Sequence, residues 1–294
     1  MPDIPVWNKC DNLCVMCANT AGFARNTSRD YLLPAQARRL ERHLRGGAAY
    51  RKNARTAGAW NLTGGEPTLN PDLLKLLAYF RRRLPGARLT LLSNGRRFAD
   101  PAFAAAVCAA AGRPFSVAVS LHGPGPALHD SVTGVKGSFA RTVAGLKNLF
   151  ALPRPPEVEL RVILHRLNYR SLGAVLAFLR RVFPGRDYRV VVMHYESEGR
   201  GAGNAARLAV PLSATAARVN AAARALLYFP EARLYHFPLC LLKPPLRPLA
   251  AVSLPPEDRV YPGPCRGCAL RPACVGLMRP YFRAFGASEL EGPV

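Results

Sequence analysis

Long apolar runs and acidic residues are both scarce in this chain. No segment approaches the roughly eighteen uninterrupted apolar residues of a membrane span, and Met1 to Lys9 lack the basic and apolar stretches of a signal peptide. We find no internal repeat and no low-complexity tract beyond a bias toward Ala and Arg. These absences predict a cytoplasmic globular protein without a membrane partner, and 294 residues with 49% apolar content supply a sizeable core.

The scarcity of acidic residues leaves a strong positive charge. Lys and Arg number 41 against 18 Asp and Glu, a formal net charge of +23. Such a field attracts nucleic acid, an anionic membrane or an acidic peptide. However, 35 of the 41 are Arg, spread along the chain amid heavy Ala and Pro usage, as a genome rich in G and C would also produce. A nucleic acid partner is therefore an alternative and not the leading expectation.

Short apolar runs alternate with amphipathic stretches from about Val6 to Glu196, which predicts alternating strands and helices. The strands are expected at 4–9, 58–63, 87–92, 115–121, 157–165 and 189–195, and the helices at 33–46, 70–83, 100–112, 138–150 and 170–183. Strands joined by helical crossovers indicate an α/β protein with a parallel sheet, curled or open.

Two of the predicted strands carry polar residues on one face. In 158–165 one face is aliphatic and the other includes Arg161, while in 116–122 the corresponding face includes Ser120 and His122. A fully packed barrel interior would exclude these polar groups. They indicate an interior that receives a ligand.

The C-terminal part differs in composition. Ser197 to Asn204 is rich in Gly, a helix is expected near 213–228, and a Pro-rich stretch from Pro238 leads to a group of cysteines. We therefore expect a barrel domain over 1–210, followed over 211–294 by a helix and a loop-rich cysteine segment.

Seven of the eight cysteines fall into two groups, which in a reducing compartment indicate metal sites before disulfides. Cys10, Cys14 and Cys17 have C-x3-C-x2-C spacing. Tetrahedral zinc needs four ligands, and the nearest histidine downstream is His43. Three thiolates suit three corners of an iron–sulfur cube and leave the fourth iron open to a non-protein ligand. Because a cluster that only carries electrons normally has four cysteines, the open iron indicates a catalytic cluster. The remaining Cys108 lies in an apolar stretch and is expected in the core.

This spacing directly after a first strand resembles the signature of the radical S-adenosylmethionine (SAM) superfamily. The resemblance implies a partial (β/α)6 barrel of the TIM type, with a [4Fe-4S] cluster on Cys10, Cys14 and Cys17 and SAM bound at the open iron. It also implies that an electron from an external donor cleaves SAM to a 5'-deoxyadenosyl radical, which removes a hydrogen atom from a substrate. A zinc or redox-sensor site at these cysteines is the alternative.

The run Gly64-Gly65-Glu66-Pro67 follows the second predicted strand and looks like the superfamily's motif for the SAM amino group. Its two glycines permit close backbone approach to a ligand, Glu66 can accept from an ammonium group, and Pro67 fixes the turn. Taken alone, such a turn is also an ordinary connector between strand and helix.

Polar residues end the next strands, at the edge where such folds place their ligands. By resemblance, Ser93, Asn94 and Ser120 would bind the ribose or methionine part of SAM, and Arg161 would pair with its carboxylate. The alternatives are an ordinary turn for Ser93 and Asn94 and a structural ion pair between Arg161 and Glu159. Three more residues at strand ends are candidates either for the substrate cavity or for hydrogen-bonded wall positions, namely His122, His194 and Glu196.

The second group, Cys240, Cys265, Cys268 and Cys274, offers four thiolates from a loop-rich segment. Four ligands complete one site, and a structural zinc knuckle is one alternative. The other is an auxiliary [4Fe-4S] cluster, because the segment resembles the C-terminal extensions of radical SAM enzymes that act on peptides. A full extension of the SPASM type has seven cysteines for two clusters, so this one looks shortened.

Over about Cys10 to Gly276 the chain is most similar to the His-Xaa-Ser system radical SAM maturases. The similar segments are 64–69, 91–96, 129–139, 160–165 and 239–242. The resemblance implies a ribosomally made peptide as substrate, with crosslinking, epimerisation or related C–H chemistry. Only nine residues precede Cys10, so we expect leader binding by the barrel, the C-terminal segment or a partner protein. The Pro-rich stretch between Cys240 and Cys265 departs from that family.

Two other functions fit the same residues. A radical SAM enzyme acting on RNA or a small molecule would account for the charge, and its binding to RNA would weaken steeply with salt. A non-catalytic binding module stabilised by zinc would be colourless, whereas the peptide enzyme would carry about eight irons per chain.

Overall fold

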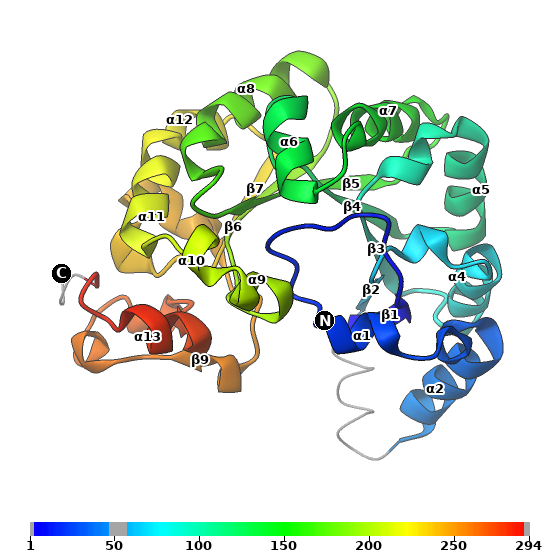
Figure 1. Ribbon diagram of the computed structural model, residues 1–294, viewed down its shortest axis with the longest axis horizontal. Coiled ribbons are helices and arrows are strands. Elements are labelled where there is room, and N and C mark those ends of the chain that lie inside the picture. Colours follow the sequence, from blue (N-terminus) through cyan, green and yellow to red (C-terminus); the bar gives the residue numbers. More distant parts are fainter. Residues whose placement is uncertain (1–2, 47–57, 291–294) are drawn as a thin grey trace. The chain divides into compact units, whose positions relative to one another are not determined.

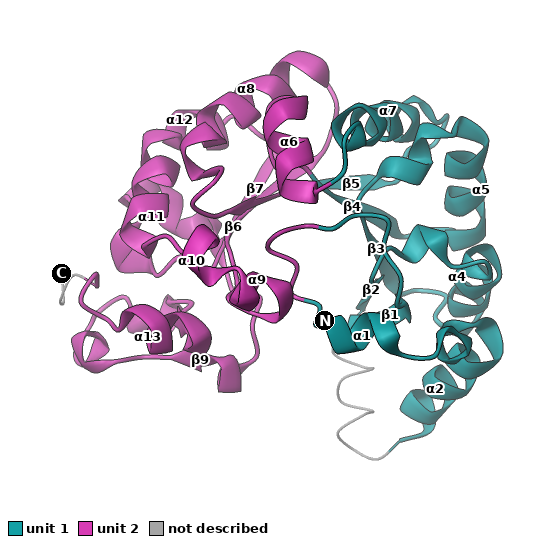
Figure 2. Ribbon diagram, in the orientation of Figure 1, with its two compact units in different colours: residues 1–13, 19–120, 135–159 teal, residues 14–18, 121–134, 160–294 magenta. Residues whose placement is uncertain are grey.

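The computed structural model describes residues 3–46 and 58–290, in which helices alternate with strands along the chain (Figure 1). The chain divides into two compact units (Figure 2). The first consists of 1–13, 19–120 and 135–159, and the second of 14–18, 121–134 and 160–294. No helix in the described residues is long and apolar enough to cross a bilayer.

The first unit contains four strands that pair in sequence order, each parallel to the next. They are β1 (Asp3–Trp7), β2 (Ala59–Gly64), β3 (Arg88–Ser93) and β4 (Phe115–Ser120). The helices of this unit are α1 (Ala21–Arg25), α2 (Leu33–Arg45), α4 (Leu73–Arg83), α5 (Pro101–Ala111) and α7 (Ser138–Ala151). Leu62, Leu91 and Val117 are at most 1% exposed, as expected for central strands buried on both faces.

Helix α4 shows why these segments are helical. Its apolar residues Leu73, Leu76, Leu77 and Phe80 recur at helical spacing and are at most 2% exposed, so they form one buried stripe. Each of these side chains contributes roughly 1.5–3 kcal/mol by leaving water. The last turn is basic, over 81–83, which complements the partial negative charge at a helix C-terminus.

The second unit contains β6 (Arg189–His194), β7 (Glu231–Tyr235) and β8 (Ala250–Ala251), again parallel and paired in order. A separate antiparallel ribbon joins β9 (Arg259–Val260) to β10 (Leu277–Met278). The helices are α6 (Pro126–Thr133), α8 (Leu172–Val182), α9 (Gly199–Gly203), α10 (Ala205–Leu208), α11 (Leu212–Ala221), α12 (Ala223–Leu226) and α13 (Arg279–Phe285).

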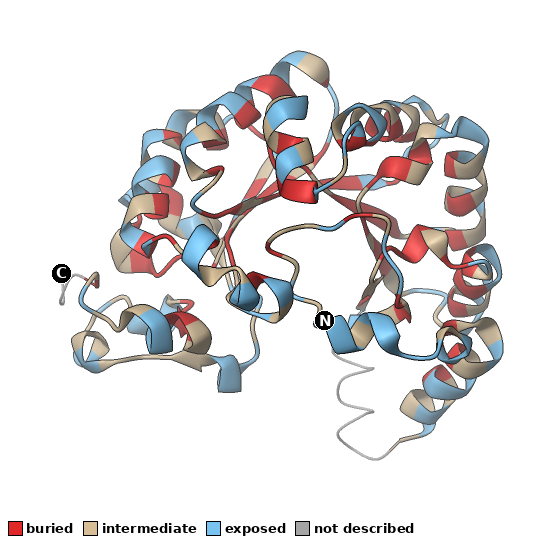
Figure 3. Cartoon of the chain, in the orientation of Figure 1, coloured by how far each residue is buried: buried red, intermediate tan, exposed pale blue. Residues whose placement is uncertain are grey.

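Strand β5 (Glu157–Leu164) carries the chain from the first unit into the second, and the order of the eight-stranded sheet follows the sequence from β1 to β8. Buried residues are concentrated in the strands (Figure 3). This parallel sheet with helical crossovers confirms the predicted α/β class and is consistent with a partial barrel of the TIM type.

The six predicted strands agree with β1 to β6 to within two residues at each end, and the five predicted helices with α2, α4, α5, α7 and α8 to within three. The helix expected near 213–228 is divided into α11 and α12. Strand β7 was not predicted because Glu231 and Arg233 interrupt its apolar pattern, and α9 was not predicted because three of its five residues are Gly. The predicted boundary at residue 210, between a barrel domain and a C-terminal cysteine segment, stays a prediction.

Candidate functional site

Cys10 lies shortly after β1, and the turn after β2 holds the segment that leads to it. The Gly65 N–H donates to the Trp7 carbonyl, and the Glu66 N–H donates to the Lys9 carbonyl, both at 2.7 Å. A Cβ at Gly65 would lie 2.2 Å from the Lys9 oxygen. Only glycine therefore allows the two backbones to approach this closely.

Gly64 has the same constraint on the other side of the peptide. Its φ is +123°, and a Cβ there would lie 2.2 Å from the Trp7 oxygen. From the sequence, both glycines were expected to permit close approach of a ligand. In the structure, a Cβ added at either position would meet protein backbone. Pro67 begins a short 3-10 turn, Pro67–Leu69, and fixes its first φ.

Glu66 is 1% exposed, and its carboxylate accepts four hydrogen bonds from the protein. Its Oε1 accepts from the Thr68 N–H and hydroxyl, at 3.0 and 2.7 Å, and from the Ser93 hydroxyl at 2.8 Å. Its Oε2 accepts from the Asn94 N–H at 2.6 Å. Burial raises the pKa of Glu66 against the opposing effect of these donors. Glu66 thus ties the end of β2 to the end of β3, and in this arrangement its oxygens bind protein donors where an ammonium group was expected.

The turn after β3 binds the residue that follows Cys10. Asn94 Nδ2 donates to Asp11 Oδ1 at 2.7 Å. Arg96 forms an ion pair with Asp11 Oδ2 at 3.0 Å, and its Nη1 also donates to the Asp11 carbonyl and to Asn12 Oδ1, both at 2.8 Å. The first unit therefore holds the backbone on both sides of Cys10 through the turns after β2 and β3.

The second unit binds the residues around Cys14 and Cys17. The Val15 N–H donates to the Val132 carbonyl at 3.0 Å, and the Val15 carbonyl accepts from Asn204 Nδ2 at 2.8 Å. The Gly201 N–H donates to the Cys17 carbonyl at 3.1 Å.

Between these bonds, the Met16 side chain is buried against a small apolar cluster. It packs with Val132, Tyr195 and Leu208, and is 7% exposed. These contacts exclude water from one side of the loop and fix its conformation.

Sequence reasoning did not identify Asp11, Arg96, Gly201 or Asn204. Arg96 lies 85 residues from Asp11, and no local pattern connects them. The Gly-rich composition of 197–204 was the one signal for the segment that binds Cys17.

Ser120 and Arg161 remain candidates. Ser120 ends β4 in the first unit and is half-buried. Arg161 lies in β5 in the second unit, is half-buried, and its carbonyl accepts from the Leu121 N–H at 2.9 Å. Their roles toward SAM stay predictions.

Five of the six histidines are buried in the second unit, and burial lowers the pKa of His129 and His165 to about 4 and that of His194 to about 3. His194 Nδ1 lies 2.9 Å from the Thr215 hydroxyl, which itself donates to the Leu212 carbonyl. Nδ1 therefore carries the proton. This hydrogen bond is consistent with a wall position for His194, one of the two alternatives that the sequence left open.

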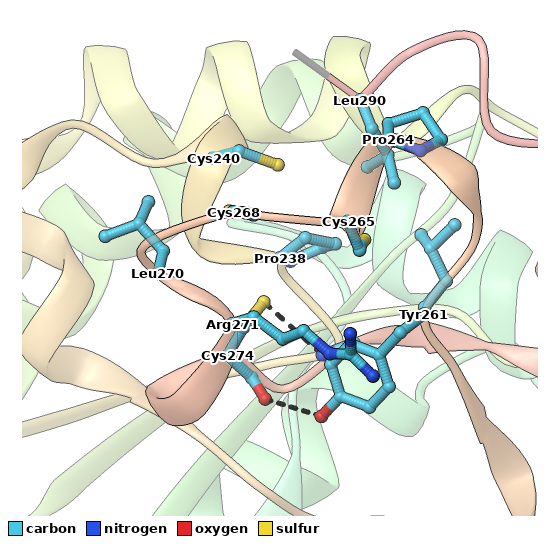
Figure 4. A pocket seen from close by; sticks show the side chains of 12 residues that line it. Pro238, Cys240, Tyr261, Pro264, Cys265, Cys268, Leu270, Arg271, Cys274 and Leu290 are labelled. Carbon is cyan, nitrogen blue, oxygen red and sulfur yellow. Dashed lines mark hydrogen bonds between the residues drawn. The ribbon is translucent and has the colours of Figure 1, made fainter. Parts of the chain in front are cut away.

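The four C-terminal cysteines line one pocket (Figure 4). They are Cys240, Cys265, Cys268 and Cys274. The Cys274 sulfur accepts from the N–H groups of Leu239 and Gly276, both at 3.5 Å, and its carbonyl accepts from the Tyr261 hydroxyl at 2.8 Å.

Burial and the neighbouring thiols raise the pKa of Cys240 to about 11. Four sulfurs around one pocket, one of them already bonded to N–H groups, fit the donor set of an iron–sulfur cluster and also that of zinc. In the part of the chain that the structure describes, no three Cys, His, Asp or Glu side chains converge on a single ion position.

Neither cysteine group contains a disulfide. All eight cysteines lie in the described residues, and none is in a disulfide. Cys108 lies apart in α5, where burial raises its pKa to about 11.

A family model described as the radical SAM superfamily matches residues 4–179, which include the N-terminal cysteine loop and the turns after β2, β3 and β4. This chain belongs to the radical SAM superfamily. Membership implies a [4Fe-4S] cluster and SAM as cofactors, as the resemblance predicted.

Among curated proteins, the chain is similar to mycofactocin maturase MftC of Mycobacterium ulcerans (strain Agy99), with 33% identity over 142 residues. The alignment covers 48% of this chain and 36% of MftC, so the aligned part spans about a third of that relative's length.

Among solved structures, Streptococcus suis SuiB bound to S-adenosylmethionine matches with a TM-score of 0.59 and 16% identity, over 89% of this chain and 55% of SuiB. A second SuiB structure, bound to the precursor peptide SuiA, has a TM-score of 0.49 and 17% identity, over 67% of this chain and 40% of SuiB. At such identity the likeness to SuiB concerns the fold.

Proposed function

We propose that this chain is a radical SAM enzyme that modifies a ribosomally made peptide. Cys10, Cys14 and Cys17 would ligate the [4Fe-4S] cluster. The SAM site would include Gly64, Gly65, Glu66, Pro67, Ser93, Asn94, Ser120 and Arg161. The observation that carries the proposal is the superfamily match over residues 4–179, within which the cysteine loop is tightly hydrogen-bonded.

When bound, the cluster and SAM supply a 5'-deoxyadenosyl radical that removes a hydrogen atom from the substrate. The chain's own residues orient the loop and control its electrostatics. Arg96 offsets the charge of Asp11 next to Cys10, and the Asn12 N–H lies 3.4 Å from the Cys10 sulfur. Hydrogen bonds to ligating sulfurs tune the potential of iron–sulfur clusters. Met16 keeps water from one side of the loop.

A peptide substrate is supported by the comparisons. MftC is named a maturase, and its identity to this chain is 33% over the aligned part. SuiB, whose fold extends over 89% of this chain, is also described in complex with a precursor peptide. The reaction would be a crosslink, an epimerisation or related C–H chemistry. The finer similarity to the His-Xaa-Ser system maturases names one candidate class of substrate, and a leader-binding protein would be a partner.

We further propose an auxiliary [4Fe-4S] cluster on Cys240, Cys265, Cys268 and Cys274. Four sulfurs at one pocket support it. It would bind substrate or receive an electron from it, so that residues 1–210 form the catalytic core and 211–294 the auxiliary segment. An external electron donor would reduce the N-terminal cluster.

Anaerobic reconstitution with iron and sulfide, followed by SAM, a strong reductant and a candidate peptide, tests the proposal. We expect about eight irons per chain, and a peptide product that lacks two hydrogens or has exchanged one with solvent. Zinc without iron would favour a structural module. Binding of RNA that weakens steeply with salt, with the peptide unmodified, would favour an RNA substrate.

A further inference from the structure

His236 has a backbone conformation that residues with a side chain rarely adopt. It directly follows β7, and its φ of +69° makes it the one non-glycine residue with positive φ across 3–46 and 58–290. Such conformations persist where the surroundings fix them, and they are concentrated at functional sites. The residue is 4% exposed, so its environment is set by the protein.

Hydrogen bonds fix which ring nitrogen of His236 is protonated. Nδ1 lies 2.9 Å from the His194 carbonyl oxygen. Because a carbonyl only accepts, Nδ1 carries a proton. The other nitrogen, Nε2, lies 2.9 Å from Ser253 Oγ and 3.2 Å from Glu196 Oε1. In the neutral ring Nε2 therefore carries a lone pair, which faces the Glu196 carboxyl group.

A lone pair and a carboxylate oxygen are both acceptors, so their separation of 3.2 Å requires a proton on one of them. Ser253 does not remove this requirement. Its single hydroxyl proton satisfies one acceptor at a time, and the second acceptor still faces the first. The geometry thus describes an imidazole and a carboxyl group with one proton between them.

The charged neighbours favour retention of that proton. Glu198 interacts electrostatically with Glu196, Asp258 and His236, and burial is the main cause that raises the pKa of Glu198. Burial lowers the pKa of His236 to about 4, against the raising effects of its bond to the His194 carbonyl and of Glu198. Arg259 is the basic residue that lines the same pocket as His236 and Ser253. Burial therefore opposes an imidazolium at His236, and Glu198 favours one.

The two residues also stand where a substrate would bind. Glu196 follows β6 and His236 follows β7, at the C-terminal ends of two paired parallel strands, the edge at which such sheets bind ligands. A Cβ built on Gly201 would lie 3.2 Å from both the Glu196 and the Met16 oxygen. The Glu196 backbone therefore adjoins the loop of Cys14 and Cys17.

We propose that Glu196 and His236 form an acid–base pair that holds one shared proton, and that Glu196 exchanges a proton with the substrate. The substrate in this inference rests on the proposed function. Glu196 is the group that reaches outward, because its side chain is 28% exposed and that of His236 is 2% exposed. His236 is a positioning residue that holds the proton through Nε2.

The step is a proton transfer without a change of oxidation state. A substrate N–H, O–H or acidified C–H bond breaks, its electron pair stays on the substrate, and the proton passes to Glu196. The pair then holds two protons and one more positive charge, and the reverse transfer restores the first state.

Infrared spectroscopy of the full chain tests the shared proton without any need for SAM. At about pH 7 the difference between wild type and Glu196→Gln should contain the carbonyl stretch of a protonated carboxyl group, or 15N spectra of labelled histidine should show His236 as imidazolium. Glu257→Gln, at an exposed position outside the pair, should show neither difference. An ionised Glu196 beside a neutral His236 would overturn the proposal.

The pH profile of product formation tests the transfer itself. Glu196→Gln should lower the rate by about a hundredfold, the usual scale of general acid–base catalysis, and flatten the pH profile. His236→Asn removes the imidazole and should shift the pH profile. Asn is the chosen substitution because it tolerates positive φ. Glu257→Gln should match wild type. An unchanged rate and profile in Glu196→Gln would overturn the role in transfer. A wild-type enzyme that leaves SAM intact would instead overturn the proposed function, and the infrared result would still decide the pair.

Discussion

Arg96 binds Asp11 twice, through an ion pair of 3.0 Å and through a hydrogen bond of 2.8 Å to its carbonyl. The Arg96 side chain is 10% exposed and that of Asp11 is 30% exposed, so solvent screens this pair only in part. Asp11 follows Cys10 directly, and Arg96 therefore determines the path of the backbone as it leaves that cysteine.

We expect Arg96→Gln to lower the free energy of unfolding by about 2 kcal/mol, since it leaves a partly buried carboxylate without its cation. The reconstituted variant should retain less iron than wild type, as measured by iron analysis and visible absorbance. Arg83→Gln removes an exposed ion pair with Glu41 and should leave the iron content unchanged. Full iron retention in Arg96→Gln would contradict the role assigned to the pair.

Gly65→Ala should disturb the entry to the cysteine loop. The added Cβ would lie 2.2 Å from the Lys9 oxygen, and relief of such overlap costs about 1–3 kcal/mol. We expect a lower melting temperature and loss of iron binding. Gly86→Ala is the matched control, because no heavy atom lies within 4 Å of its added Cβ. If the two variants behave alike, close backbone approach does not explain Gly65.

The buried histidines should make stability depend on pH. The pKa of His165 falls from 6.5 to about 4 in the folded chain because of burial. Between these pH values the unfolded chain binds a proton at His165 and the folded chain does not. The free energy of unfolding therefore decreases as pH falls from about 6.5 toward 4, by up to about 1.4 kcal/mol per pH unit for each such group. Urea unfolding at several pH values should show that the free energy of unfolding depends less steeply on pH in His165→Gln than in wild type. An equal slope would show that His165 is protonated alike in both states.

Cys274→Ser should halve the iron content. If the second cysteine group holds its own four-iron cluster, the variant keeps about four of about eight irons and retains the N-terminal cluster. Cys108→Ser, in α5 and apart from both groups, should keep all of them. Unchanged iron together with lost zinc in Cys274→Ser would identify the second site as a structural zinc site.

Local patterns were sufficient to predict the strands β1 to β6 and the two cysteine groups. Buried parallel strands such as Val190–Val192 appear as continuous apolar runs, and the spacing of Cys10, Cys14 and Cys17 is contained in eight residues. Strand β7 was not predicted because it begins with Glu231, a charged residue of the kind typical of a protein surface. In the structure Glu231 forms an ion pair with Arg189 of the neighbouring strand β6.

The interactions around the site were beyond sequence because they join distant segments. Asp11 and Arg96 are 85 residues apart, and Val15 and Asn204 are 189 apart. The two glycines of the turn after β2 were identified, but their steric reason depends on where β1 passes. The positive φ of His236 has no sequence signal, since it follows from bonds to Ser253 and to the backbone of His194.

The production of 5'-deoxyadenosine tests the account most directly. The anaerobically reconstituted chain, given SAM and a strong reductant, should release 5'-deoxyadenosine, detected by chromatography and mass spectrometry. Cys14→Ala should release none, because two thiolates do not retain the cluster. A wild-type preparation that binds no iron and leaves SAM intact would contradict the catalytic account.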